Sequence, residues 1–300
     1  MNIENLVAAQ PVFSVIFAGP QVPDSIISDA KGIAGDECGF SIRILKAGQS
    51  VKLTVTHDDG LNTKDVFGKL KELGRRNDVS FAIFPGTADP PRFRFAIMDM
   101  DSTLINQEVI EELAEFAGVR EHVTRVTTMA MEGKLDFHEA LRERVKLLAG
   151  QPASILDEVY YHRITATPGL EEMLAGFKKL EIKTAVVSGG FQPIVEPFAK
   201  KVGIDHAIAN TLEIVDEKLT GNVVGAIVDS EVKKRTLLEL CRHYGCEPSE
   251  AIAIGDGAND LKMIRESGLG IAFCAKQIVQ DEALCAINRR RLDDVLLFLH

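Results

Sequence analysis

Three short apolar runs, each followed directly by a cluster of polar residues, constrain the fold of this 300-residue chain most strongly. The apolar runs are 95–98, 184–187 and 251–254, and the polar clusters after them are 99–103, 188–190 and 255–260. Uninterrupted apolar runs of this kind are typical of strands buried on both faces of a parallel sheet. Ligands bind such sheets at the carboxyl ends of the strands. The sequence therefore predicts that the three clusters converge on one crevice suited to phosphate and a metal ion.

The composition narrows the range of partners. The chain is 46% hydrophobic and 26% charged, and its formal net charge of −10 argues against nucleic acid or an anionic membrane as the main partner. No apolar stretch approaches the roughly 20 residues that span a bilayer, and the first residues lack the pattern of a secretory signal. The five cysteines include no Cys-x-x-Cys pair, which favours reduced thiols over a zinc ribbon. We expect a cytoplasmic protein.

Residues 1–90 predict a small α+β domain. Strand patterns at 13–18, 40–44, 51–56 and 79–84 alternate with helix patterns at 24–35 and 63–75. Their order, β-α-β-β-α-β, is a ferredoxin-like arrangement, and the proline-rich segment 85–91 ends it. This element order resembles ACT-type regulatory domains, which implies an amino-acid effector or a homodimer. A purely structural packing or dimerisation role stays open, because a fold does not carry a function.

Residues 93–300 predict a second domain of the α/β class. Strands alternate with helices along this region, which indicates a doubly wound parallel sheet. A helical tract at about 106–166 follows directly after the first strand. Such an insert would sit above the carboxyl end of that strand. We expect it to act as a cap over the crevice.

The first polar cluster carries two carboxylates. Asp99 and Asp101 are two residues apart at a strand end, so they point the same way if the backbone stays extended. One carboxylate can then attack a phosphorus atom while the other handles protons. The cluster can also be an ordinary acidic turn, in which Ser102 or Thr103 caps the next helix.

The other two clusters add groups for an anion and a cation. The glycines of 188–190 let backbone N–H groups approach an anion, and Lys233 can hold a phosphate as a point charge. Asp256, Asn259 and Asp260 offer the oxygen ligands that Mg²⁺ prefers. Each feature has a plainer interpretation: a turn, a helix cap at one of the three oxygen-bearing residues, or a solvated lysine.

Taken in chain order, these clusters resemble the signature of the haloacid dehalogenase superfamily over about residues 93–297. Within the superfamily, the stretches 98–108, 131–137, 141–145 and 271–276 are similar to the phosphoserine phosphatases. The resemblance implies hydrolysis of O-phospho-L-serine to L-serine and phosphate, the last step of serine biosynthesis. It also implies an aspartyl-phosphate intermediate and Mg²⁺ as the cofactor.

The resemblance implies a role for each candidate residue. Asp99 would be the nucleophile, and Asp101 the general acid and later the general base. Mg²⁺ would be held by Asp99, the backbone carbonyl of Asp101 and Asp256, with Asp260 in or near the next shell of groups. The residues that would position the phosphoryl oxygens are Ser188, Gly189, Lys233 and Asn259.

The helical insert would select the substrate. By resemblance, Arg144 would bind the carboxylate of phosphoserine and Glu108 its ammonium group, while Met131 and Phe137 would wall the pocket. Without the resemblance, Arg144 fits a solvated helix face. Another small phosphomonoester, or phosphoryl transfer to an alcohol such as homoserine, would use the same chemistry. A protein that acts mainly as an amino-acid sensor is the alternative from a different class.

Overall fold

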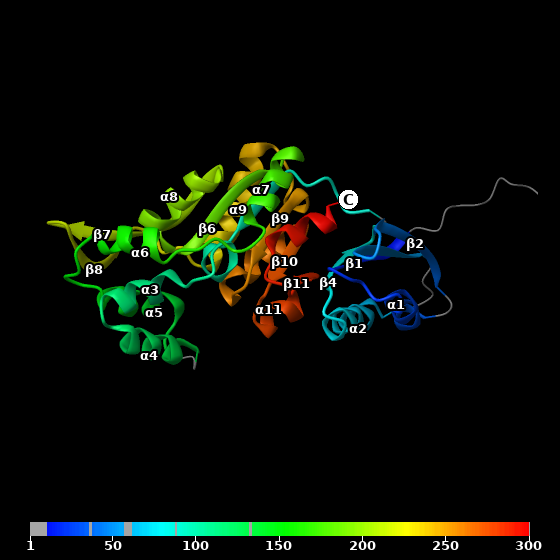
Figure 1. The fold of residues 1–300 in the computed structure, drawn as a ribbon, viewed down its shortest axis with the longest axis horizontal. Helices are drawn as coiled ribbons and strands as arrows, with labels where there is room; N and C mark the ends of the chain where they lie inside the picture. The colour runs from blue at the N-terminus through cyan, green and yellow to red at the C-terminus, as the bar shows by residue number, and fades with distance from the viewer. Residues whose placement is uncertain (1–10, 36–37, 57–61, 88, 132–133, 300) are drawn as a thin grey trace, which may run out of the picture.

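The computed structural model describes residues 11–35, 38–56, 62–87, 89–131 and 134–299 (Figure 1). The strands are β1 (Pro11–Ala18), β2 (Gly39–Lys46), β3 (Ser50–Thr56), β4 (Ser80–Pro85), β5 (Phe95–Met98), β6 (Lys183–Phe191), β7 (His206–Val215), β8 (Lys218–Val224), β9 (Ala251–Gly255), β10 (Leu269–Phe273) and β11 (Cys285–Ile287). The helices are α1 (Ile26–Ala34), α2 (Thr63–Arg76), α3 (Val109–Phe116), α4 (Arg120–Met131), α5 (Phe137–Lys146), α6 (Ile155–His162), α7 (Leu170–Lys179), α8 (Gln192–Val202), α9 (Ser230–Tyr244), α10 (Leu261–Glu266) and α11 (Gln277–Glu282).

The three apolar runs form neighbouring strands at the centre of one sheet. The sheet order is β2-β3-β1-β4-β11-β10-β9-β5-β6-β7-β8, and the strands from β11 to β7 are parallel to their neighbours. All four residues of β5 are fully buried. Ala96 and Met98 belong to one apolar cluster, and Phe95 and Ile97 to another. The alternation shows that this strand is covered on both faces, as its uninterrupted apolar sequence predicts.

Different helices cover the two faces of the sheet. One apolar cluster contains residues of α7, α8 and the C-terminal turns η5 (Leu292–Phe298). The other contains residues of α1, α2, α9, α10 and α11. Helices on both faces of a mostly parallel sheet define a doubly wound α/β architecture, which confirms the fold class predicted for the C-terminal region.

The N-terminal strands belong to the same sheet. β2, β3, β1 and β4 pair antiparallel in that order, and the element order up to β4 is the predicted β-α-β-β-α-β. β4 then pairs antiparallel with β11, joining Ala82 to Cys285. The proline-rich segment after β4 therefore does not separate the two regions in space. The division into domains at 1–90 and 93–300, and the ACT-type assignment, stay predictions.

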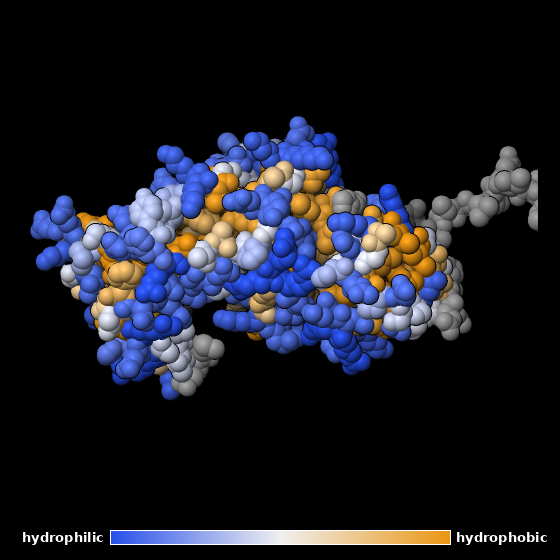
Figure 2. Space-filling model, viewed as in Figure 1, coloured by the Kyte–Doolittle hydropathy of each residue, from blue (hydrophilic) through white to orange (hydrophobic). Residues whose placement is uncertain are grey.

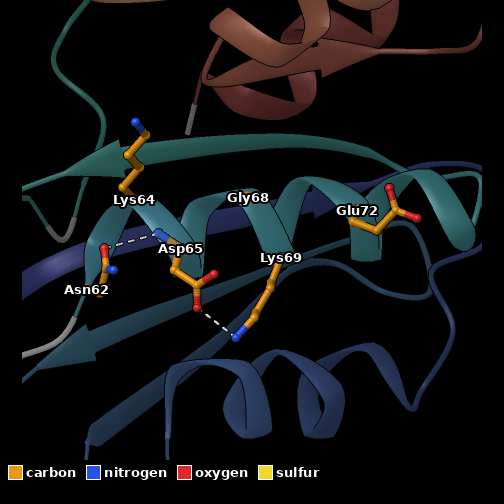
Figure 3. A pocket seen from close by; sticks show the side chains of 6 residues that line it. All are labelled: Asn62, Lys64, Asp65, Gly68, Lys69 and Glu72. Carbon is orange, nitrogen blue, oxygen red and sulfur yellow. Dashed lines mark hydrogen bonds and ion pairs between the residues drawn. The ribbon is translucent and has the colours of Figure 1, made fainter.

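Local interactions explain where helix α2 begins and how it packs on the sheet. The side chain of Asn62 accepts a hydrogen bond from the backbone N–H of Asp65, which satisfies one of the open donors at the helix start. Asp65 and Lys69 form an ion pair at 2.7 Å across one turn (Figure 3). Valine and leucine at 66 and 70 are buried against the sheet. Asn62 therefore caps the start of α2.

The helical insert that we predicted as a cap over the crevice consists of α3, α4, α5 and α6. It is called the cap below. It leaves the sheet after β5 and returns before α7, and its two connecting strands pair through a bridge between Ile105 and Ala166. In Figure 1 its helices gather at the end of the molecule opposite α1 and α2. Backbone hydrogen bonds between Gly150 and Leu219 and between Leu219 and Gln151 attach the cap to β8. The helical insert therefore stands over the carboxyl ends of the central strands.

No helix in the described part of the chain is long and apolar enough to cross a membrane. Cys241, Cys246, Cys274 and Cys285 are free thiols, in keeping with the absence of Cys-x-x-Cys pairs.

Candidate active site

A cavity of about 610 Å³ lies where the three polar clusters meet beneath the cap. The predicted site residues that line it are Asp99, Asp101, Glu108, Arg144, Ser188, Gly189, Asp256 and Asn259. β5, β6 and β9 supply the groups at its base, and the cap supplies Glu108 and Arg144. Lys233 is fully buried and lies behind Asp99 rather than on the cavity wall. The convergence predicted from the strand ends is confirmed.

A buried lysine links two of the carboxylates. Lys233 Nζ donates to Asp99 Oδ1 at 2.6 Å and to Asp260 Oδ1 at 2.7 Å. Burial by itself lowers the pKa of Lys233, but Asp260 and Asp99 raise it above its ordinary value, so the ammonium stays charged. Burial raises the pKa of Asp99 well above its ordinary value, and Lys233 opposes that shift. Lys233 is thus required to keep two neighbouring carboxylates in the interior.

The carboxylates of Asp99, Asp256 and Asp260 form a cluster that can hold a metal ion. One oxygen from each lies within 4.8 Å of the others. Both oxygens of Asp260 are engaged, one by Lys233 and the other by the backbone N–H of Gly257 at 3.0 Å. In the described part of the chain, no hydrogen bond occupies Oδ2 of Asp99 or of Asp256. Hard oxygen donors of this kind fit a divalent cation, with Asp99 and Asp256 as direct ligands.

The buried and acidic surroundings of Asp256 shift its pKa. Burial, followed by Asp260 and Glu108, raises the pKa of Asp256 to about 6. Carboxylates whose pKa is raised by neighbouring negative charge are typical of sites completed by a cation. The side chain of Asp101 is not part of the carboxylate cluster. Its predicted contribution to the metal, a backbone carbonyl, stays a prediction.

Asp101 faces the cavity with an unsatisfied oxygen. Its Oδ1 is buried and has no hydrogen-bond partner within the described residues, while Oδ2 accepts from the backbone N–H of Val109 at 3.4 Å. Burial, Glu108 and Asp99 raise the pKa of Asp101 well above its ordinary value. A raised pKa favours the neutral acid, which can donate a proton. The turn η2 (Met100–Leu104) that follows β5 directs this side chain toward the cavity.

Neither hydroxyl after Asp101 caps a helix, contrary to the alternative drawn from the sequence. Ser102 adopts φ of +56° and donates to Glu108 Oε1 at 2.6 Å, and Thr103 Oγ1 donates to Asp256 Oδ1 at 3.4 Å. Helix α3 begins only at Val109. The turn keeps the two hydroxyls at the site, where each supports a carboxylate.

The last part of β6, residues 188–190 (called the glycine loop below), is shaped by the absence of side chains at Gly189 and Gly190. The backbone N–H of Gly190 donates to Ser188 Oγ at 2.8 Å, so the Ser188 O–H remains available to a ligand. A Cβ atom at Gly190 would lie 3.0 Å from Ser188 Oγ and 3.4 Å from Asp101 Oδ2. Asn210 on β7 holds the loop from below, donating to Gly189 O at 2.8 Å and accepting from Val228 N at 2.8 Å. A side chain at Gly190 would therefore crowd Ser188 and Asp101, which favours glycine there.

The cap forms the wall of the cavity that faces the strand ends. Arg144 is half-buried, and its only hydrogen bond in the described part of the chain runs from Nε to Ala140 O within α5. Burial lowers its pKa, and Glu108 and Asp101 oppose that shift. Phe137 reaches the glycine loop, because its Cζ would lie 3.4 Å from a Cβ at Gly189. The side chain of Met131, also predicted in this wall, lies outside the described residues.

Sequence reasoning missed several residues of the site. Lys276, which follows β10, and Glu111 on α3 line the cavity, and Asn210 supports the glycine loop. Lys276 lies within a stretch that carried the family resemblance, at the end of a parallel strand, which is the signal that can identify it. No local pattern marks Asn210, because its partners are 18 and 21 residues away in the sequence.

The site and the fold agree with comparisons against known proteins. Residues 93–268 match the family model of the haloacid dehalogenase-like hydrolases. The chain therefore belongs to the haloacid dehalogenase-like hydrolase family. Within it, the chain is 47% identical over 206 residues to a phosphoserine phosphatase from Streptomyces coelicolor, a match that covers 69% of this chain and 50% of that relative. The chain thus spans about half the length of this curated relative.

Solved structures extend the similarity to the whole chain. A haloacid dehalogenase family hydrolase from Salmonella enterica serovar Typhi superposes with a TM-score of 0.83 at 31% identity, covering 96% of this chain and 99% of the other. A substrate-bound phosphoserine phosphatase superposes with a TM-score of 0.65 at 40% identity, covering 69% of this chain and 99% of the other.

Proposed function

We propose that this protein is a Mg²⁺-dependent phosphatase that hydrolyses O-phospho-L-serine to L-serine and phosphate. One observation carries the proposal. The cavity that contains Asp99 and Asp101 also contains Arg144, a half-buried cation with no ion-pair partner among the described residues. A buried charge without a partner is costly, so this guanidinium calls for an anionic ligand. Similarity to phosphoserine phosphatases supports the same substrate.

The substrate's three charged groups match three parts of the cavity. The phosphate lies against Asp99, the glycine loop and Asn259, where Ser188 O–H and backbone N–H groups donate to it. The carboxylate accepts two hydrogen bonds from Arg144. The ammonium group donates to Glu108, whose position is set by the hydrogen bond from Ser102. Phe137 excludes water from the covered cavity.

Asp99 acts as the nucleophile. Its ionised carboxylate attacks phosphorus, forming the aspartyl-phosphate as the bond to the serine oxygen breaks. Lys233 stabilises the ionised form and keeps it oriented. Asp99, Asp256 and the carbonyl of Asp101 would hold Mg²⁺, which would supply positive charge against the repulsion between carboxylate and phosphate. The burial of Asp99 makes these charges necessary, because burial favours the neutral acid.

Asp101 transfers the protons. Its carboxylic acid protonates the departing serine oxygen, since an alkoxide is a poor leaving group. The ionised Asp101 then removes a proton from a water molecule, which attacks the aspartyl-phosphate and releases phosphate and free Asp99. The raised pKa of Asp101 suits the first of these steps.

Phosphate release from O-phospho-L-serine, measured with and without Mg²⁺, tests the proposal. We expect turnover that requires the cation and is lost in Asp99→Asn, with the far-ultraviolet circular dichroism spectrum unchanged. A panel of other small phosphomonoesters, with homoserine as an added acceptor, serves as the control for substrate choice. Normal turnover in Asp99→Asn would disprove the nucleophile assignment, and preference for another ester would disprove the substrate.

We also propose that residues 1–90 form an ACT-like domain through which two copies associate. The sheet order β2-β3-β1-β4 supports the fold assignment, and β2 at the edge of the sheet exposes Ile42 and Ile44 by 47% and 69%. An open edge strand offers unpaired backbone groups to a second chain. An amino-acid effector at this domain is a proposal carried by the resemblance in element order. The free thiols support a reducing, cytoplasmic location.

A further inference from the structure

Helix α5 of the cap carries two residues that face the cavity, Phe137 at its start and Arg144 two turns later. Its C-terminal end packs on β8, where a Cβ at Gly221 would lie 3.2 Å from the backbone of Lys146. Its N-terminal end meets the first turn of α9. There, His138 Nε2 lies 2.8 Å from Asp229 Oδ2. This hydrogen bond joins the cap to the helix that carries Lys233.

Asp229 is a fixed anchor for His138. Its Oδ1 accepts from the backbone N–H groups of Glu231 and Val232, each at 2.9 Å, and so caps α9. Burial raises the pKa of Asp229, but hydrogen bonds from Val232, His138 and Glu231 lower it below its ordinary value. The ionised carboxylate can only accept hydrogen bonds, so His138 Nε2 is the donor. Oδ1 of Asp229 thus caps α9, and Oδ2 accepts the hydrogen bond from His138 in the helical insert.

The pair controls the part of α5 next to the glycine loop. His138 does not line the cavity, but it is adjacent to Phe137, whose ring contacts the loop at Gly189. The start of α5 is also fixed internally, because Asp136 accepts from Glu139 N and Glu139 Oε2 accepts from Asp136 N. The first turn of α5 is therefore held together internally, and Asp229 anchors it to α9.

We propose that His138 is a positioning residue: through Asp229 it sets the first turn of α5 so that Phe137 covers the glycine loop and Arg144 faces the substrate. The role in catalysis rests on the proposed function, whereas the role in holding α5 against α9 does not. Loss of the pair leaves the chemical groups in place and loosens the wall of the cavity. The substrate then binds less tightly, and the chemical step changes less.

Four variants of the full chain test this proposal. His138→Ala removes the pair, and Asp229→Ser removes it while keeping a side chain that caps α9. His138→Gln keeps an N–H donor for Asp229. His162→Ala removes a solvent-exposed pair with Glu158 inside α6 and is the matched control. The measurements are kcat and KM for O-phospho-L-serine and the hydrogen–deuterium exchange of residues 137–146.

We expect His138→Ala and Asp229→Ser each to lower kcat/KM roughly fivefold, mainly through KM, and to speed exchange in α5. The double variant should lose no more than either single one, because both changes break the same contact. His138→Gln and His162→Ala should resemble the unchanged protein. Additive losses, equal loss in His138→Gln, or unchanged exchange in His138→Ala would overturn the proposal. If the unchanged protein does not hydrolyse phosphoserine, the proposed function fails, and the exchange data alone still decide the role of His138.

Discussion

At the residue scale, the environment gives chemically identical carboxylates different tasks. Lys233 contacts Asp99 and Asp260, so these two groups gain a positive charge that Asp101 lacks. Asp101 instead has a buried oxygen without a partner and neighbours that raise its pKa. Burial raises the pKa of both groups, but the hydrogen-bonded ammonium of Lys233 opposes the rise at Asp99, whereas Glu108 and Asp99 add to it at Asp101. This difference supports the proposed assignment of attack to Asp99 and proton transfer to Asp101.

The pKa of Asp256 predicts how pH affects metal binding. The folded protein binds a proton at Asp256 up to about pH 6, against an ordinary value of 3.8, so stability contributed by this group is lost as pH rises through this range. A bound cation stabilises the ionised form and reverses the loss. We expect Mg²⁺ to raise the melting temperature more at pH 7.5 than at pH 5.

Differential scanning calorimetry with and without Mg²⁺ at the two pH values measures this difference, and Asp256→Asn provides the control. In that variant the extra stabilisation by Mg²⁺ at pH 7.5 should largely disappear. A Mg²⁺ effect on the melting temperature that does not change between pH 5 and pH 7.5 would contradict the role given to Asp256.

At the element scale, the strand ends supply the carboxylates of the cavity, and a cap helix supplies the arginine that we propose selects the substrate. Arg144 and Arg142 lie on the same helix, but Arg144 lines the cavity whereas Arg142 is exposed. The sequence alone allows both to be solvated. The packing of α5 between β8 and the glycine loop decides which arginine faces the cavity.

Arg144→Ala should therefore raise KM for O-phospho-L-serine by roughly 10- to 100-fold, the effect of losing hydrogen bonds to a charged group. An aryl phosphate such as p-nitrophenyl phosphate has no amino-acid carboxylate, so its KM should change little. Steady-state kinetics on both substrates measure the difference, and Arg142→Ala is the matched control. Equal losses on the two substrates would place Arg144 outside the amino-acid subsite.

At the scale of the whole molecule, one sheet joins the N-terminal region to the catalytic region. β4 pairs with β11, and Ile16 and Phe84 share an apolar cluster with Phe298 of the C-terminal turns. Removing residues 1–90 would expose this surface, so a truncated protein is a poor test of regulation. A substitution on β2, at the free edge of the sheet, is a better test of the N-terminal region. Figure 2 shows hydrophobic surface over this end of the molecule.

Ile44→Asp tests association through β2. A charge on the exposed edge disfavours pairing with another strand, so we expect the variant to be monomeric in a protein that otherwise dimerises. Light scattering after size-exclusion chromatography measures the mass, and kcat should stay unchanged because β2 is remote from the cavity in the sheet order. Ile278→Asp, at an exposed position on α11, is the control. A dimer that persists in Ile44→Asp would exclude this edge as the interface.

The amino-acid sequence by itself determined the buried strands, the polar clusters at their ends and the helical insert between them. These features are local: apolar runs select buried strands, and a parallel sheet brings their carboxyl ends together. The sequence did not show that Lys233 lies behind Asp99, that Asn210 supports the glycine loop, or that β4 continues the sheet into β11. Those contacts join residues far apart in the chain, so only the packing of the folded molecule decides them.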